Sequence, residues 1–199
     1  MSKAKFESNI RKEQIIKASI DIISKSGVRG LSITSIAKAV GIVPSAIYRH
    51  YENKKEILLD ISKMFSLNLT KLIEKAEAQE QNPLSRVKKV LYLHVQLLIQ
   101  NRFFPIFMFS EEVFLEDNNL KQQFKASFGK FLTHIAKYFN EAKEQNLIRQ
   151  DISEQSLTIM YLGLFLPIAM SLIVLGVEFE VISQVDSNWD MFLKGILPR

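Results

Sequence analysis

The stretch GLSITSIAKAVGIVPSAIYRHYENKKEIL, residues 30–58, decides the fold. Ser32 is a typical N-cap residue, and the short apolar segment that follows it stops at Gly41. Glycine ends helices well because it adopts the left-handed conformation at little cost. Pro44 then opens a second short helix, since proline lacks the amide hydrogen that would go unpaired at the first helical position. Two short helices joined by a glycine-containing turn form a helix-turn-helix.

The second of these helices, expected over residues 44–51, needs neighbours because a helix of two turns is unstable alone. We expect Ile47 to face inward against Ala37 of the preceding helix. Tyr48 and Tyr51 can each pack a ring inward and offer a hydroxyl to a phosphate, although either could instead be a core aromatic residue and His50 a surface histidine that makes no contact. The residues expected to face outward, on a helix narrow enough for the major groove of DNA, are Ser45, Ala46, Arg49 and His50.

The positive charge of the chain is concentrated at its start. Residues 1–63 hold twelve Lys/Arg and six Asp/Glu, whereas the other 136 residues hold fourteen and fifteen. This distribution is typical of a polyanion-binding module joined to a nearly neutral one. Lysines that only solvate helix surfaces would give the same charge pattern, so this alternative stays open.

Residues 10–60 resemble the N-terminal DNA-binding domain of the TetR family of transcriptional repressors. The positions at that family's spacing are Gly27, Ile36, Ala37, Gly41, Ile47, Tyr48, Tyr51, Lys54 and Ile57. The resemblance implies phosphate contacts by Ser45, Tyr48, His50 and Lys54. It implies base-edge contacts by Ala46 and Arg49, and it places Thr34 against the DNA. Val43 stands where the family commonly has serine, so one cap or phosphate hydrogen bond should be missing.

The rest of the chain also predicts helices, because apolar residues recur at intervals of three and four and alternating strand patterns are scarce. We expect an all-α protein of about nine helices. Residues 1–53 are expected to form the helix-turn-helix domain and residues 54–199 a helical ligand-binding and dimerisation domain, with a continuous helix near 54–80. The chain has no cysteine. Its first residues lack the apolar stretch of a secretory signal, so we expect a cytoplasmic protein.

Residues 155–177 carry no charged side chain and are long enough to span a membrane. Against a span, acidic residues flank both ends and Pro167 interrupts the run. A helix that is apolar all round is also typical of a buried core or a subunit interface. We therefore expect the two last helices to pair with those of a second copy as a four-helix bundle. The expected interface residues are Leu172, Leu175, Trp189, Phe192, Leu193 and Ile196.

Phenylalanines are concentrated in residues 103–139. Most should be core residues, but the family resemblance implies a small-molecule effector among the C-terminal helices, and such pockets are lined by apolar and aromatic side chains. The candidate lining is His94, Phe107, Phe128, Phe131, His134, Tyr161 and Phe165. Either histidine could instead be an ordinary, hydrogen-bonded core residue. The effector should be apolar or aromatic, and a cationic one is conceivable.

Nothing in the sequence indicates catalysis or a cofactor. The three histidines are spread over 85 positions, and neither metal-ligand spacing nor a nucleophile or phosphate-loop motif occurs. We therefore expect a homodimeric, DNA-binding transcriptional regulator, a repressor that a small apolar effector releases from a palindromic operator. A dimeric DNA-binding regulator that needs no ligand is the alternative.

Overall fold

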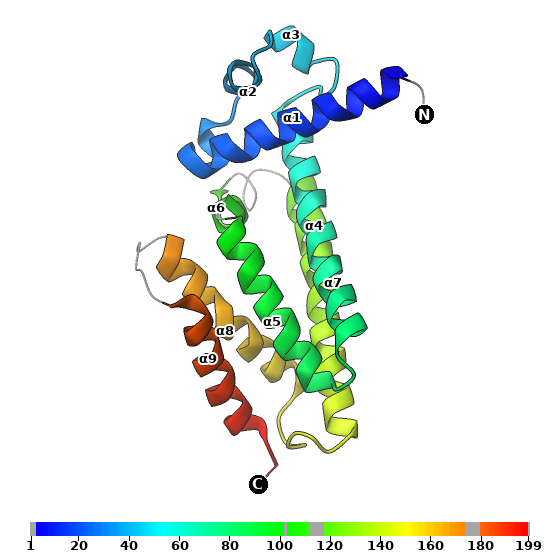
Figure 1. Ribbon diagram of the computed structural model, residues 1–199, viewed down its shortest axis with the longest axis vertical. Coiled ribbons are helices and arrows are strands. Elements are labelled where there is room, and N and C mark those ends of the chain that lie inside the picture. The colour runs from blue at the N-terminus through cyan, green and yellow to red at the C-terminus, as the bar shows by residue number, and fades with distance from the viewer. Residues whose placement is uncertain (1–2, 102, 112–117, 174–179, 199) are drawn as a thin grey trace. The chain divides into compact units, whose positions relative to one another are not determined.

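The computed structural model describes residues 3–101, 103–111, 118–173 and 180–198. Within these ranges the chain forms nine α-helices, a short 3-10 helix and no strand (Figure 1), which confirms the all-α prediction. The elements are α1 (Lys3–Ser26), η1 (Val28–Gly30), α2 (Ile33–Val40), α3 (Pro44–Ile47), α4 (Lys54–Gln79), α5 (Pro83–Gln100), α6 (Phe103–Met108), α7 (Asn118–Glu144), α8 (Glu154–Ile173) and α9 (Val181–Ile196).

The helices belong to two compact units. The first contains Met1–Ser66 and Arg102–Lys125, and the second contains Leu67–Asn101 and Ala126–Arg199. The chain passes from the first to the second within α4, the continuous helix that the sequence predicts near residues 54–80. The compact units therefore divide the chain differently from the domain boundary expected after residue 53, which stays a functional prediction.

In the first unit, α1 crosses the helix-turn-helix and supplies its core (Figure 1). Ile15 and Ile23 of α1 are completely buried, as are Ile36 of α2 and Ile47 of α3. Burial of one such side chain contributes about 1.5–3 kcal/mol, so these four isoleucines account for a large part of the driving force that holds the short helices. The α1 helix ends before Gly27, whose φ of 68° and ψ of 179° lie in a region open mainly to glycine, though not in the left-handed helical one.

A second group of buried rings completes the first unit. Phe65 of α4 packs edge-on against Phe104 of α6, with ring centroids 4.9 Å apart, and stacks on Phe124 of α7 at 5.7 Å. Pro105 does not break the helix of the aromatic segment FFPIFM, residues 103–108, because it falls in the first turn of α6, where a missing amide hydrogen is tolerated. The aromatic segment is thus a short helix within the core.

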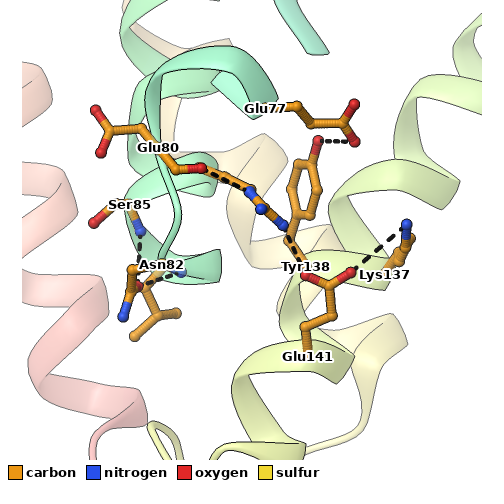
Figure 2. Close-up of polar contacts among 9 residues, drawn as sticks. Glu77, Glu80, Asn82, Ser85, Lys137, Tyr138 and Glu141 are labelled. Atoms are coloured by element: carbon orange, nitrogen blue, oxygen red, sulfur yellow. Dashed lines mark hydrogen bonds and ion pairs between the residues drawn. The ribbon is translucent and has the colours of Figure 1, made fainter. Parts of the chain in front are cut away.

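The second unit is tied together by polar contacts where α4 ends and α5 begins (Figure 2). Asn82 caps α5 by accepting the amides of Leu84 at 2.9 Å and Ser85 at 3.2 Å, as the Asn-Pro pair predicts. Figure 2 also shows Tyr138 of α7 donating its hydroxyl to Glu77 of α4 at 2.9 Å. Burial, with Glu77 adding to it, raises the pKa of Tyr138 above its ordinary range.

An ion pair joins α5 to α7 in the same place. Arg86 donates from Nη1 to Glu141 at 3.0 Å and from Nε to the Glu80 carbonyl at 2.9 Å. The side chains of Arg86 and Glu141 are only 20% and 26% exposed. Lys137 also approaches Glu141, at 3.6 Å, but it is 63% exposed (Figure 2).

We expect Arg86→Ala to lower the free energy of unfolding by about 1–3 kcal/mol, because it leaves a half-buried carboxylate and a carbonyl without their main donor. Lys137→Ala removes an exposed partner of the same carboxylate and should cost less than about 1 kcal/mol. Urea unfolding at 25 °C measures both. Equal losses for the two variants would show that the half-buried Arg86–Glu141 ion pair contributes no more to the free energy of unfolding than the exposed Lys137 contact does.

The apolar helix α8 is a core helix of the second unit. Among the helices described, none is long and apolar enough to span a membrane. Tyr161, Phe165 and Ile168 of α8 are buried. Asn188 of α9 donates to the Leu164 carbonyl at 2.9 Å, which fastens α9 to α8. The tail of the apolar run, residues 174–177, lies outside the described residues.

Candidate nucleic-acid interface

The start of α2 and the turn after it follow the sequence prediction. Ser32 Oγ accepts the amide of Ser35 at 3.0 Å, and Ser35 Oγ accepts the amide of Ser32 at 2.9 Å. This reciprocal capping box fixes where α2 begins. Gly41, with φ 75° and ψ 35°, ends it in the left-handed conformation. The chain is thereby turned toward α3.

The second helix of the motif is shorter than expected. It covers Pro44–Ile47 rather than residues 44–51. The amides of His50 and Tyr51 both donate to the Ile47 carbonyl, at 2.8 and 3.1 Å, so the backbone tightens into a turn where a second helical turn was predicted. Ile47 itself is completely buried, as predicted, and holds this turn against the core.

The side chains predicted to meet DNA lie on or beside these elements. Thr34 of α2 and Ser45 of α3 are exposed, and so are Tyr48, at 56%, and Arg49 in the turn. Ala46 is half-buried. A tyrosine and a guanidinium exposed together suit a phosphate and a base edge respectively.

His50 lies among basic side chains. Its Nδ1 is 3.3 Å from the hydroxyl of Ser8 on α1, and the residue is half-buried. Burial lowers the pKa of His50, and the charges of Lys12, Arg11 and Arg49 lower it further. These three cations on α1 and in the turn surround the imidazole, so positive charge gathers beside the exposed face. The partner Ser8 was not among the predicted site residues, because nothing in the sequence pairs it with a residue 42 positions away.

Two predicted phosphate donors have partners inside the protein. Tyr51 is 3% exposed, and its hydroxyl donates to Asp60 at 3.1 Å, so the expected phosphate contact by that hydroxyl is wrong for this structure. Lys54 donates from Nζ to the Val28 carbonyl at 2.8 Å. An ammonium has three donors, so a phosphate contact by Lys54 stays a prediction.

Val43 is the N-cap residue of α3 and makes no side-chain cap, as expected from the missing serine. We expect Val43→Ser to raise the free energy of unfolding by about 0.5–2 kcal/mol, because a hydroxyl at the N-cap can accept an amide of the first helical turn, such as that of Ser45. Val43→Ala shortens the side chain without providing a cap and should bring no gain. Thermal and urea unfolding compare the three proteins, and an equal effect of both substitutions would exclude capping as the cause.

Comparison with known proteins supports this arrangement. A family described as bacterial regulatory proteins, tetR family, matches residues 15–61, the part that holds α2, α3 and the core of α1. Residues 15–61 form an N-terminal domain of the TetR family. Its relative YerO, an HTH-type transcriptional regulator of Bacillus subtilis (strain 168), is 30% identical over 119 residues. That match spans 58% of this chain and 41% of YerO, so less than half of YerO is covered.

Solved structures show a likeness of fold over more than nine-tenths of the chain. FadR from Bacillus subtilis, in complex with stearoyl-CoA, has a TM-score of 0.77 at 19% identity over 92% of this chain and 98% of that one. The TetR family transcriptional regulator PfmR from Thermus thermophilus has a TM-score of 0.76 at 19% identity over 93% and 96%. The matched family and the relative YerO are described as regulators, in agreement with the prediction that the chain is not an enzyme.

The structure brings most of the predicted effector residues together in the second unit. His94 of α5 contacts Phe131 of α7 and Phe165 of α8, and Tyr161 contacts the same two rings. Phe128 stacks beside Phe131 at 6.0 Å. Two predicted residues are placed elsewhere. His134 is exposed, with its Nδ1 2.9 Å from the Lys130 carbonyl, and Phe107 is buried on α6 in the first unit.

The predicted dimer residues are mostly inside the chain. Trp189, Phe192 and Ile196 are 3–7% exposed, and Phe192 packs against Phe139 of α7. Leu193 is half-buried. The side chain of Leu172 and all of Leu175 lie outside the described residues. Because Trp189, Phe192 and Ile196 are buried within the chain, little of their surface is available for contact with a second copy.

A groove between α8 and α9 offers other residues for that contact. Its volume is about 740 Å³. Its lining includes Met160, Gly163, Pro167, Ser171, Gln184 and Met191. Met160 and Met191 are 57% and 65% exposed. This face could not be predicted from the sequence because α8 is apolar all round, although Met160, Gly163 and Pro167 recur at helical spacing.

Proposed function

We propose that this TetR-family protein is a homodimeric transcriptional regulator that binds a palindromic operator sequence-specifically and represses until a small apolar effector releases it. The observation that carries the proposal is the surface formed by α3 and the turn after it. Buried Ile47 holds Tyr48 and Arg49 exposed, next to the cations around His50. A guanidinium can bind guanine O6 and N7 together, and the surrounding cations supply salt-dependent affinity for any duplex.

The dimer is proposed to form through the exposed apolar face of α8 and α9. Met160 and Met191 are large apolar side chains exposed on a groove, which is unusual unless such a surface is covered. A two-fold axis there would let each copy cover the other with the same residues. The second copy would place its recognition turn at the neighbouring half-site, about 34 Å along the duplex.

The effector site is proposed at the ring cluster of His94, Phe131, Tyr161 and Phe165. The likeness to FadR, whose structure holds stearoyl-CoA, supports a ligand with an apolar acyl portion. An effector that binds more tightly to a dimer with wrongly spaced recognition turns would shift the population away from the DNA-bound form. Its effect cannot exceed the difference between its affinities for the two forms.

Selection of bound duplexes from a random pool tests the proposal. We expect recovery of an inverted repeat with guanine at a fixed position in each half-site. Enrichment of a single unrepeated motif would contradict the dimeric arrangement, and no enrichment at low salt would contradict the DNA-binding function itself.

A regulator that needs no ligand is the second candidate. It is favoured by the close packing of the ring cluster, since Phe131 and Tyr161 are 3% and 0% exposed, as in an ordinary core. Release of the selected duplex in the presence of apolar compounds decides between the two. If no compound stabilises the protein or releases the duplex, the ligand-independent regulator replaces the first candidate.

A further inference from the structure

Two polar atoms in the ring cluster are buried and have no hydrogen-bond partner among the residues that the structure describes. They are Nδ1 of His94 on α5 and the hydroxyl oxygen of Tyr161 on α8. His94 is 2% exposed and Tyr161 is 0% exposed, so bulk water does not satisfy either group. Folded proteins keep few such atoms because an unpaired buried polar group is costly, and each one calls for an explanation.

The two atoms belong to one place in the second unit. The His94 ring lies 4.3 Å from that of Phe165 and 5.3 Å from that of Phe131. The Tyr161 ring lies 5.8 Å and 6.4 Å from the same two phenylalanines. Both polar side chains therefore border the same two phenylalanine rings, and a small group bound between those rings would lie beside each of them. Three helices, α5, α7 and α8, meet there, so a molecule bound at this point contacts a large part of the unit.

Electrostatics restricts what that group can be. Burial lowers the pKa of His94 to about 4 and raises the pKa of Tyr161 above its ordinary range. Both side chains are therefore neutral at physiological pH. No charged side chain in the described part of the chain shifts either pKa, so a carboxylate or an ammonium brought here would lose its hydration without gaining an opposite charge from those residues.

We infer that the effector carries one uncharged oxygen, a carbonyl or a hydroxyl within an otherwise apolar molecule, which hydrogen-bonds Tyr161 and His94 together. The inference rests on the proposed ligand-responsive function and names the chemistry of its ligand. The Tyr161 hydroxyl donates to the oxygen. His94 Nδ1 donates to a carbonyl in one tautomer and accepts from a hydroxyl in the other. The ketone, ester or thioester of an acyl compound meets this requirement, and a cationic effector does not.

Four probes of equal chain length test the ligand chemistry: octan-2-one, octan-2-ol, octanoate and octylammonium. Titration calorimetry with the full chain should show the ketone and the alcohol binding at least about tenfold more tightly than both ions. Equal binding of the ions, or no binding of either neutral probe, overturns the inference.

The variant Tyr161→Phe tests the residue itself, with Tyr138→Phe as its matched control. Tyr138 is equally buried, but its hydroxyl is paired with Glu77. Tyr161→Phe removes an unpaired hydroxyl and should raise the Tm of the ligand-free protein by about 2–4 °C, while it weakens octan-2-one binding at least about fivefold. Tyr138→Phe should lower the Tm and leave the binding of octan-2-one unchanged.

A fall in Tm for Tyr161→Phe would mean that its hydroxyl already has a partner such as a trapped water, and unchanged ketone binding would mean that it touches no ligand. Either result overturns the inference. Operator binding measured on the same samples separates this failure from that of the proposed function. A protein that binds its duplex but none of the neutral probes refutes only the effector chemistry, whereas one that binds octan-2-one but no duplex refutes the regulator.

Discussion

Gly163→Glu should convert the dimer into a monomer and lower operator affinity about 100-fold or more. Gly163 lines the groove between α8 and α9, and a Cβ atom added there meets none of the described residues within 4 Å. The single chain therefore accepts the substitution, and helix propensity favours it by up to about 1 kcal/mol. In the dimer, however, the carboxylate would be buried against the apolar face of the second copy. A monomer binds only one half-site at a time, and simultaneous binding of two half-sites is worth about 10²–10⁴ in affinity.

Gly129→Glu is the matched control. Gly129 lies on an exposed part of α7, and a Cβ atom there also has no neighbour within 4 Å in the part of the chain that the structure describes. The variant gains the same charge and should remain dimeric and bind the operator as the original protein does. Sedimentation equilibrium gives the assembly state, and titration of the selected duplex gives the affinity. A Gly163→Glu protein that stays dimeric would remove α8 and α9 from the proposed interface.

Arg49→Ala should relax sequence preference and weaken binding to the operator more than it weakens binding to random duplex. Arg49 is exposed in the turn after α3, where its guanidinium can bind guanine through two hydrogen bonds. Loss of such a pair costs about 1–3 kcal/mol of discrimination, or about 5- to 150-fold. Arg49→Lys keeps the charge but not the planar fork, so it should lose the same discrimination and keep the salt dependence of binding.

Lys54→Ala provides the contrast. It removes a positive charge, so it should weaken binding to specific and random duplexes alike. It also removes the hydrogen bond to the Val28 carbonyl, so it should lower the free energy of unfolding by about 0.5–1.5 kcal/mol. Competition titrations with guanine-substituted and random duplexes measure both effects. If Arg49→Ala and Lys54→Ala reduce both kinds of binding equally, the proposed division between base reading and phosphate contact is wrong.

Local signals predicted the helix ends well and the helix lengths less well. The roles of Ser32, Gly41 and Asn82 depend on hydrogen bonds within a few residues, so the sequence alone indicates them. The length of α3 depends instead on contacts between residues that are farther apart in the sequence. Tyr51 is drawn into the core and donates to Asp60, and the backbone tightens at Ile47 to allow it.

The sequence predicted only part of the ring cluster, because helical periodicity shows which face is buried in some helices and not in others. His94 falls on the same stripe of α5 as the buried Leu91 and Leu98, so helical periodicity directs it inward. His134 follows Phe131 by three residues, but the buried line of α7 runs through Ile135 and leaves His134 at its edge. In α8 periodicity cannot choose a face at all, because apolar residues surround the helix. Which of its side chains remain exposed becomes visible only once the helix is packed.

A comparison of two duplexes tests the central claim most directly: the selected palindrome, and the same duplex with one half-site scrambled. Binding is titrated at low salt, and native mass spectrometry counts the chains on each duplex. A dimer that presents Arg49 twice should place two chains on the palindrome and lose about 100-fold in affinity when one half-site is scrambled. One chain per duplex with equal affinity for both, or no binding to either, would contradict the account.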